Sequence, residues 1–375
     1  MKIISIVGAR PNFMKMAPIH KEFIKNYPEV KHLICHTGQH YDDNMSKIFF
    51  EQFGLSEPDF YLGVGSGSQA EQTAKIMIEF EKVAINEKPD LVIVYGDVNS
   101  TLACSIVAAK LGIKIAHVEA GLRSFDMTMP EEINRILTDR ISDYLFVTEK
   151  SGIENLKREG VDESKIFFVG NVMIDSLITF LKEADNSEIL KELDLIGKDF
   201  ILVTMHRPSN VDSQEFLEEF FNLLQSFSKT TKIVFPIHPR TRNNIEKFGI
   251  NVNSDVILTE PIGYIDFLSL LKNAKLVLTD SGGIQEETTF LGVQCITIRN
   301  NTERPITVEE GTNTLAGTNL EIVKDIINQR LNGEIKIGKI PEKWDGKAGE
   351  RVCEFLMRIL ITNRINKLDS IVIKL

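Results

Sequence analysis

Residues 2–15, KIISIVGARPNFMK, decide the fold class of this chain. The run Lys2–Val7 is apolar almost throughout, as expected for a parallel strand covered by helices on both faces. Gly8 marks a tight turn, and Pro11 stands where a helix begins. A strand, a tight turn and a helix in this order predict the first βα unit of a parallel sheet.

The same alternation of short apolar runs and longer helical stretches recurs along the chain, which is typical of βαβ units. The first series of predicted strands comprises Lys2–Val7, His32–His36, Asp90–Tyr95, Ile113–His117 and Tyr144–Thr148, and the second comprises Asp199–Met205, Lys232–Ile237, Val256–Leu258, Lys275–Thr279 and Cys295–Arg299. Two such series predict an α/β fold of two Rossmann-like, doubly wound domains that face a cleft. We place the first domain at residues 1–170, joined by a C-terminal helix at about 347–375, and the second at 171–346. The stretch Ser213–Ser228 predicts an amphipathic helix behind an Asp212/Glu215 capping pair.

Composition narrows the function classes. The chain has 375 residues, 43 basic and 53 acidic, for a net charge of −10, which disfavours nucleic acid or an anionic membrane as the main partner. Its four cysteines lie far apart without a CxxC pair, as in proteins of a reducing cytosol, and they predict neither disulfides nor a zinc knuckle. No apolar run approaches the ~18 residues of a membrane span. We therefore expect a cytoplasmic protein.

Polar residues follow the predicted strands of the first domain, at the sheet edge where ligands bind in such folds. Arg10 and Lys15 bring two cations to the start of a helix, which favours an anion. Asp97, Glu119 and Glu131 all fall at predicted loop positions on this edge, and three converging carboxylates could transfer protons. Taken singly, Asp97 is better explained as a helix cap, and Glu131 suits an ordinary helix start.

The second domain carries cations at the same edge. His206 and Arg207 end one strand, and His238 and Arg240 end the next; a His-Arg pair suits a phosphate, although a capping or packing histidine is equally consistent with each taken singly. In the stretch 280–287, DSGGIQEE, the glycines would let helix N–H groups approach a phosphate, and a carboxylate one turn inside could accept from ribose hydroxyls. Arg304 adds a further cation after another strand.

Other chemistries find less support. Gly63, Gly65 and Gly67 do not complete a dinucleotide fingerprint, so a nicotinamide cofactor is disfavoured. His36 and His40 have no third ligand nearby, which disfavours zinc. We expect neither a metal nor an organic cofactor.

Taken together, nine motifs resemble, in order, those of the non-hydrolysing UDP-N-acetylglucosamine 2-epimerases, from residue 2 to about residue 360. They are GARPNFMK (8–15), HTGQH (36–40), GDVNST (96–101), HVEAGLR (117–123), PEEINR (130–135), HR (206–207), HPR (238–240), DSGGIQEE (280–287) and TERP (302–305). The resemblance implies a glycosyltransferase-B-like fold and a homodimer that binds a UDP-sugar without a metal or nicotinamide. The family inverts C2 of the sugar by eliminating UDP to a 2-acetamidoglucal and adding it back, for cell-surface polysaccharide precursors.

The resemblance also implies residue roles. Asp97, Glu119 and Glu131 match the acid/base carboxylates, and His206 matches the catalytic histidine near the phosphates. Implied substrate contacts are Arg10, Lys15, Arg135, Arg207, His238, Arg240, Ser281, Gly282, Gly283, Glu287 and Arg304. Gln39 and His40 match a segment that binds an activating UDP-sugar in some bacterial members, although their flanking residues differ.

This chain departs from the family pattern at Pro208-Ser209-Asn210, where many members have x-Glu-Asn. Its short loop Ser124–Met129 is like that of a sister group acting on UDP-2,3-diacetamido-glucuronic acid. The alternatives to UDP-N-acetylglucosamine epimerisation are therefore this uronate substrate, a hydrolysing epimerase, a glycosyltransferase on the same fold and a non-catalytic UDP-sugar sensor.

Overall fold

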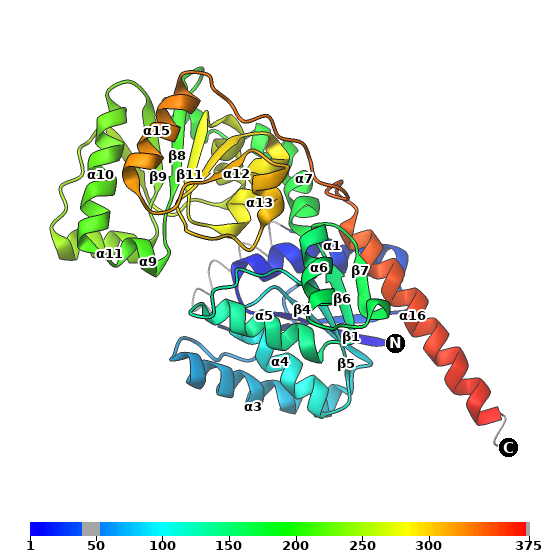
Figure 1. Cartoon of the computed structure of the whole chain (residues 1–375). Coiled ribbons are helices and arrows are strands. Elements are labelled where there is room, and N and C mark those ends of the chain that lie inside the picture. Colours follow the sequence, from blue (N-terminus) through cyan, green and yellow to red (C-terminus); the bar gives the residue numbers. More distant parts are fainter. Residues whose placement is uncertain (40–52, 373–375) are drawn as a thin grey trace. The chain divides into compact units, whose positions relative to one another are not determined.

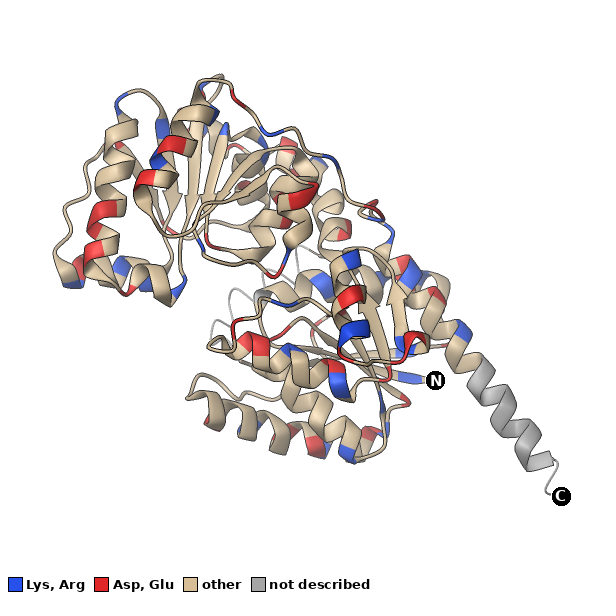
Figure 2. Cartoon of the chain, viewed as in Figure 1, with Lys and Arg blue, Asp and Glu red and all other residues tan. Residues whose placement is uncertain are grey.

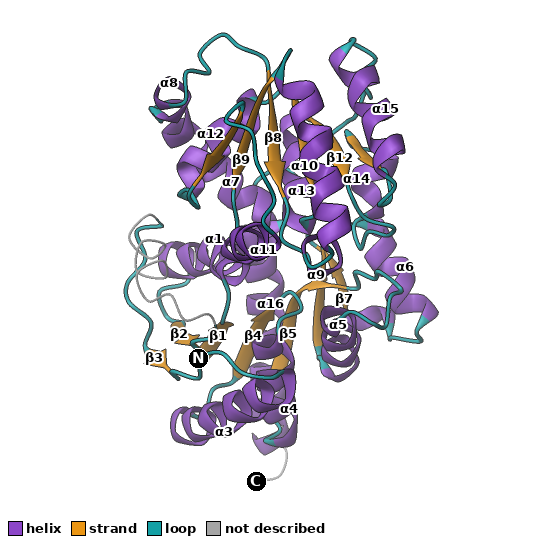
Figure 3. Ribbon diagram, turned by 90° about the vertical axis from the view of Figure 1, so that its left-hand side faces the viewer, coloured by secondary structure: helices purple, strands orange, loops and turns teal. Residues whose placement is uncertain are grey.

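The computed structural model describes residues 1–39 and 53–372, and of Arg10 and residues 362–372 it describes the backbone alone. The chain divides into two compact units. The first contains Met1–Ser176 and Glu342–Leu375, and the second contains Leu177–Pro341. Each unit is a parallel sheet with helices on its faces (Figures 1 and 3).

The first unit has a seven-stranded sheet in the order β3-β2-β1-β4-β5-β6-β7. Every pairing between neighbouring strands is parallel, and Ile3 of β1 lies opposite His32 on one side and Leu91 on the other. The order reverses between β1 and β4, which is where ligands bind in doubly wound sheets. The strands are β1 (Lys2–Val7), β2 (Lys31–His36), β3 (Phe60–Tyr61), β4 (Leu91–Tyr95), β5 (Lys114–Ala120), β6 (Tyr144–Val147) and β7 (Ile166–Phe168).

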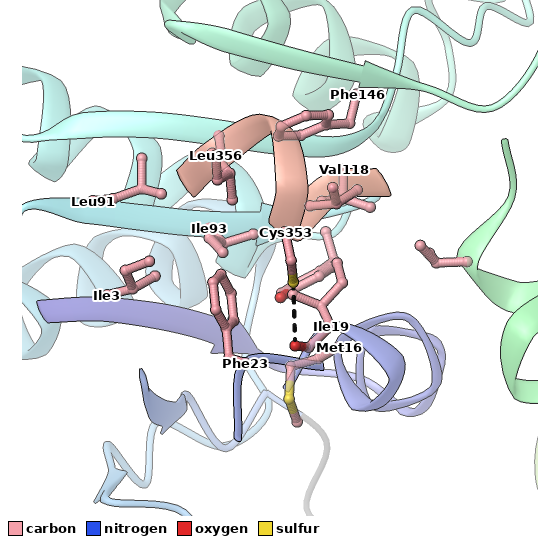
Figure 4. Close-up of a cluster of buried hydrophobic side chains, with 14 of the residues drawn as sticks. Ile3, Met16, Ile19, Phe23, Leu91, Ile93, Val118, Phe146, Cys353 and Leu356 are labelled. Carbon is pink, nitrogen blue, oxygen red and sulfur yellow. Dashed lines mark hydrogen bonds between the residues drawn. The ribbon is translucent and has the colours of Figure 1, made fainter. Parts of the chain in front are cut away.

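Helices cover both faces of this sheet. They are α1 (Arg10–Asn26), α3 (Gln69–Glu87), α4 (Asn99–Lys110), α5 (Pro130–Ile141), α6 (Lys150–Arg158), α7 (Val172–Asp185), which continues into the second unit, and α16 (Ala348–Val372), with a short 3-10 helix, η1 (Glu163–Lys165). On one face Met16, Ile19 and Phe23 of α1 pack with Cys353 and Leu356 of α16 against the strands (Figure 4). The other face is covered by α3 and α4, whose buried side chains include Ile76, Phe80 and Ala103.

The C-terminal helix α16 is tied to the first unit by Asp175 of α7. Its carboxylate accepts the backbone N–H groups of Ala348 and Gly349 at 3.2 and 2.7 Å, which satisfies donors that a helix N-terminus leaves free. Burial, opposed in part by these hydrogen bonds, raises the pKa of Asp175 to about 6. The chain segment after residue 341 is thereby fastened to the sheet that begins the chain.

The second unit repeats the design with a six-stranded parallel sheet in the order β10-β9-β8-β11-β12-β13. Its strands are β8 (Phe200–Thr204), β9 (Lys232–Pro236), β10 (Val256–Thr259), β11 (Leu276–Thr279), β12 (Gln294–Thr297) and β13 (Asn313–Leu315). Its helices are α8 (Ile189–Glu192), α9 (Pro208–Val211), α10 (Gln214–Ser228), α11 (Pro239–Phe248), α12 (Tyr264–Asn273), α13 (Gly282–Leu291), α14 (Pro305–Glu309) and α15 (Leu320–Leu331). Most strand residues are apolar and buried, and the charged residues lie mainly on helices and loops (Figure 2).

The two Rossmann-like units confirm the predicted fold class. Each predicted strand is present within a few residues, whereas the short strands β3, β7 and β13, of two or three residues each, were not predicted. The predicted capping pair of α10 is wrong: Ser213 is the N-cap, and its side chain accepts from the N–H of Phe216. No helix among residues 1–39 and 53–372 is long and apolar enough to cross a membrane.

A buried polar chain crosses the core of the first unit under α1. His20 Nδ1 lies 2.9 Å from His32 Nδ1, His32 Nε2 lies 2.8 Å from Ser5 Oγ, and Ser5 Oγ lies 2.7 Å from the Tyr95 hydroxyl. Burial lowers the pKa of both histidines; Asp59 opposes the shift at His20, and His20 adds to it at His32.

We expect this pair to make the protein less stable in acid. Below pH 6.5, the ordinary histidine value, the unfolded chain binds protons at His20 and His32 that the folded chain does not, so stability falls as the pH drops until the folded pKa values are reached. The slope should be up to about 1.4 kcal/mol per pH unit for each histidine. Urea unfolding at pH 7.5, 6.5 and 5.5 measures it, and the double variant His20→Leu/His32→Leu should show a smaller slope. An unchanged slope in that variant would assign the acid sensitivity to other groups.

Candidate active site

Glu119 and Lys15 form a buried ion pair at the carboxyl edge of the first sheet. Lys15 Nζ of α1 donates to Glu119 Oε1 at 2.7 Å, and both side chains are almost fully buried. Glu119 was predicted in a loop, but it lies near the end of β5, where the register with β6 shifts between Val118 and Ala120. Its φ of +75° is unusual for a residue with a side chain, and such strain is typical of functional positions.

Asp97 lies two residues after the end of β4, and Gly96 stands between them. The N-cap of α4 is Val98 rather than Asp97, so the capping interpretation of Asp97 is wrong. The Asp97 carboxylate instead pairs with Arg135. Gly96 has a φ of +63°, and a Cβ at this residue would lie 3.5 Å from Glu119 Oε1. The structure therefore places the Glu119 carboxylate beside the turn that carries Asp97.

Arg135 was predicted to contact substrate, and in the structure it lies between two carboxylates. One terminal nitrogen donates to Glu132 and the other to Asp97. Glu132 is fully buried and also accepts the N–H groups of Ser124 and Phe125, each at 2.9 Å. The sequence argument singled out Glu131, which is half-buried in the first turn of α5, and it missed its neighbour Glu132. Nothing in two adjacent glutamates indicates which one turns inward.

The other predicted residues of the first unit are placed only in part. Gln39 lies against α4, where its Oε1 accepts the hydroxyl of Ser100 at 2.7 Å. Arg10 is the first residue of α1. His40 lies outside the described residues.

In the second unit, Asp280 organises the predicted His-Arg turn. Its fully buried carboxylate accepts the N–H of Arg207 at 2.9 Å and the N–H of His206 at 3.1 Å. The ring Nδ1 of His206 lies 3.3 Å from the same carboxylate. Asn210, part of the stretch that departs from the family pattern, donates to it at 3.2 Å. Asp280 was not predicted, although its place directly after β11 could have indicated it.

His238 and Arg240 occupy separate settings. His238 caps α11, with its Nδ1 accepting from the N–H of Arg240, and its ring lies 5.6 Å from that of His206. The Arg240 guanidinium pairs with Asp212 at 2.9 and 2.5 Å, which lowers the pKa of this aspartate. The His238 ring thus lies beside that of His206, while the Arg240 guanidinium is engaged by Asp212.

The predicted phosphate cradle begins α13, with Ser281 as its N-cap. A Cβ on Gly282 would lie 2.5 Å from Arg304 Nη1, while a Cβ on Gly283 would meet nothing within 4 Å. A side chain at residue 282 would displace the paired ends of Arg304 and Glu303, and Gly283 leaves the first turn open to an approaching group. Glu287, one turn further, accepts from the Tyr264 hydroxyl at 2.8 Å.

Arg304, a predicted substrate contact, is part of a buried ion cluster. It lies 2.9 Å from Glu286 and 2.5 Å from Glu303, and Glu303 also pairs with Arg299 at 2.8 Å. Arg207 approaches Glu303 at 3.8 Å. These contacts hold Arg304 beside the first turn of α13, where its guanidinium packs against Gly282.

The described His, Cys, Asp and Glu side chains do not form an evident metal site. Within the part of the chain that the structure describes, no group of three or more His, Cys, Asp and Glu residues is arranged to hold a metal ion.

Comparison with known proteins assigns the chain to a family. The sequence profile described as UDP-N-acetylglucosamine 2-epimerase matches residues 22–357. The chain belongs to this epimerase family. It is 46% identical over 371 residues to the UDP-N-acetylglucosamine 2-epimerase of Methanocaldococcus jannaschii, covering 95% of this chain and 99% of the relative. The structure of an M. jannaschii UDP-GlcNAc 2-epimerase in complex with UDP-GlcNAc and UDP superposes with a TM-score of 0.88 at 45% identity, covering 96% of this chain and 100% of that one.

A second relative with a different named substrate is also similar in sequence to this chain. The UDP-2,3-diacetamido-2,3-dideoxy-D-glucuronate 2-epimerase of Pseudomonas aeruginosa is 42% identical over 364 residues, which cover 96% of this chain and 100% of the relative. The predicted family is therefore confirmed, and the two relatives differ in the sugar that their names state.

We expect Gly96→Ala to impair this epimerase more than its effect on stability alone would explain. The φ of +63° strains any residue with a Cβ, and the new atom would lie 2.9 Å from Lys15 Nζ, displacing the Lys15–Glu119 pair. Turnover should fall at least tenfold. Gly112→Ala is the matched control, because Gly112 has a φ of +70° but nothing within 4 Å of its Cβ position. Both variants should lose about 1–2 kcal/mol of stability, and equal turnover in the two would contradict the displacement.

Proposed function

We propose that the protein inverts C2 of UDP-N-acetylglucosamine to give UDP-N-acetylmannosamine, by elimination and re-addition of UDP. One observation supports the mechanism. The Glu119 side chain lies next to Gly96, and Gly96 precedes Asp97, so two carboxylates belong to the same part of the carboxyl edge of the first sheet. Inversion at a carbon needs proton transfer on both of its faces, and a pair of positioned carboxylates supplies it. Glu131 is the third proposed member of the set.

The proposed reaction is an isomerisation in which the hydrogen on C2 is replaced by another and the substrate's composition is otherwise unchanged. A carboxylate removes the C2 proton, the electron pair forms the C1=C2 double bond, and the C1–O bond breaks with its electrons moving to UDP. A proton is then delivered to the opposite face of C2, and the UDP oxygen adds back to C1. We place this proton transfer in the first unit.

The second unit is the proposed UDP holder. The start of α13 presents backbone N–H groups, Gly283 leaves space for a phosphate to approach, and His206 and Arg207 are held together by Asp280. Helix N-termini with nearby cations bind phosphates. We assign the diphosphate to Ser281, Gly282 and Gly283, and the ribose to Glu287, which Tyr264 orients. The remaining proposed substrate contacts are Arg10, Lys15, Arg135, His238, Arg240 and Arg304.

Incubation with UDP-N-acetylglucosamine in D2O, followed by NMR, tests the proposal. We expect deuterium at C2 of both epimers with the UDP linkage intact. Free N-acetylmannosamine and UDP would instead show a hydrolysing epimerase. Neither exchange nor a new sugar would contradict both forms of the reaction for this substrate.

A second substrate is favoured by one observation, the 42% identity to the P. aeruginosa enzyme over the full length of that relative. Parallel incubations with UDP-2,3-diacetamido-2,3-dideoxy-glucuronic acid therefore decide the sugar. Under our proposal kcat/KM is higher for UDP-N-acetylglucosamine. The reverse order would assign the enzyme to the uronate.

We further propose that the enzyme works as a homodimer in the cytoplasm and supplies precursors of cell-surface polysaccharides. The family resemblance supports the dimer and the pathway class. A reducing compartment is supported by Cys35, Cys104, Cys295 and Cys353, which are all buried free thiols; burial raises the pKa of Cys35 to about 12. Sedimentation velocity measures the oligomeric state, and a monomer at all concentrations would overturn the dimer.

A further inference from the structure

His117 of β5 is a fully buried histidine to which the proposed reaction assigns no role. Both of its ring nitrogens are engaged. Nδ1 lies 2.7 Å from Asp139 Oδ1 of α5, and Nε2 lies 2.7 Å from the backbone carbonyl oxygen of Gly96. The histidine therefore joins α5 to the turn that precedes Asp97.

Both partners of this ring accept hydrogen bonds. A carbonyl oxygen has no proton to give. The Asp139 carboxylate also receives the Arg123 guanidinium at 2.7 Å and the Gly121 N–H at 3.1 Å. Burial by itself would raise the pKa of Asp139, but His117 and Arg123 outweigh it, and the pKa lies below its usual range. Because a guanidinium and a backbone N–H both donate to this side chain, the geometry fits the ionised carboxylate, which can only accept.

A ring between two acceptors must donate from both nitrogens, which only the imidazolium form of histidine can do. A buried charge is tolerated when it is paired and hydrogen-bonded, and Asp139 supplies the opposite charge. Arg123 faces the same carboxylate from the other side and is in turn held by Glu159 at 2.7 Å. Lys15 and Glu119 are the charged groups next to Gly96, and they pair with each other.

The Gly96 carbonyl belongs to the turn that carries the Asp97 carboxylate. The Gly96 N–H already bonds to the Val118 carbonyl at 3.0 Å. With the carbonyl held by His117, both peptide groups of this left-handed glycine are fixed. The next residue, Asp97, is then held through its own carbonyl by Asn134 at 2.9 Å and through its carboxylate by Arg135.

We propose that His117 is a positioning residue: a buried imidazolium that, paired with Asp139, holds the Gly96 carbonyl and thereby fixes the turn presenting Asp97. This proposal rests on the proposed function in one respect, namely that Asp97 takes part in proton transfer. The hydrogen-bond arrangement itself can be tested without the reaction.

The first test uses wild-type protein labelled with 13C and 15N at pH 7.5. We expect His117 to show protons on both ring nitrogens, protected from exchange because the ring is buried, with the ring signals assigned by through-bond correlation to the His117 backbone. A single protonated ring nitrogen would overturn the imidazolium and with it the proposal. This result stands whether or not the enzyme epimerises either sugar.

The second test compares His117→Ala with His117→Gln. Alanine removes the donor to Gly96, so kcat for C2 exchange should fall about 100-fold, while KM and the affinity for UDP stay within threefold. A glutamine amide can still donate to the Gly96 carbonyl and should recover at least tenfold of the loss. A residue that only fills the core would lower the melting temperature in both variants without this kcat-specific loss or its rescue.

The two tests together decide the matter. Equal kcat in alanine and glutamine variants, both folded by circular dichroism, would overturn the positioning role. If both variants fail to fold, the NMR result on the wild-type protein decides. Absence of exchange by the wild-type enzyme on either sugar would contradict the proposed function. The NMR result would then still test whether the His117 imidazolium holds the Gly96 carbonyl.

Discussion

Glu119→Gln should abolish most turnover while UDP still binds. An amide cannot take the C2 proton or return it, and general acid–base catalysis by one positioned group contributes about 10²–10⁴-fold. We expect the rate of deuterium incorporation at C2 to fall at least 10³-fold. The affinity for UDP, measured by titration calorimetry, should stay within threefold, because the proposed UDP contacts lie in the second unit.

The control for this substitution is Glu79→Gln on α3, a carboxylate that is 40% exposed and pairs with Lys82. It should exchange deuterium at the wild-type rate. Glu119→Gln also leaves Lys15 without its charged partner in a buried setting, so a stability loss of about 3–5 kcal/mol is expected, and rates must be measured below its melting temperature. Wild-type exchange by a folded variant would remove Glu119 from the mechanism. Asp97→Asn and Glu131→Gln, tested in the same way, should also lose orders of magnitude.

Asp280→Asn should produce the complementary defect, a loss of UDP affinity. Its carboxylate accepts the N–H groups of both His206 and Arg207, and an asparagine would turn an NH2 group toward at least one donor. The remaining oxygen can still accept both N–H groups, but the amide lacks the charge of the carboxylate and its NH2 group faces the His206 N–H, so the turn should be weakened by about 1–3 kcal/mol. We expect UDP to bind about 10–100-fold more weakly, with a lower melting temperature.

Asp199→Asn is the control in the same unit, since this residue is 71% exposed and pairs with Lys275 at 3.1 Å. Its UDP affinity should equal that of the wild type. Unchanged UDP binding by folded Asp280→Asn would mean that the His-Arg turn does not hold the nucleotide. Calorimetry on both variants at one temperature makes the comparison direct.

Local sequence patterns were enough to predict the sheets. Most predicted strands are apolar almost throughout, as burial on both faces of a parallel sheet requires. The missed strands are edge pieces such as Phe60–Tyr61 and Asn313–Leu315. Their pairing depends on the neighbouring strand more than on their own composition, so no local signal identifies them.

Many residues of the candidate site could be predicted from the sequence, but the side chains with which they pair could not. Strand ends indicated Asp97, Glu119, His206 and the glycines of α13, because parallel strands collect their carboxyl ends at one edge. Arg135 and Arg304 were predicted to face substrate, yet each is held by carboxylates of its own unit. Asp280 and Glu132 were missed, since an acidic residue next to a turn looks the same whether it caps a helix, faces solvent or holds a loop.

The sequence by itself determined the α/β class, the strands and the family, because these depend on short periodic runs and on motifs whose residues are neighbours in the chain. Only the tertiary structure decided which charges meet. Lys15 and Glu119 are 104 residues apart, and they pair because β1 and β5 both flank β4 in the sheet. An ion pair acts over a few ångströms, so its partner is set by strand order and side-chain direction, which no local pattern contains.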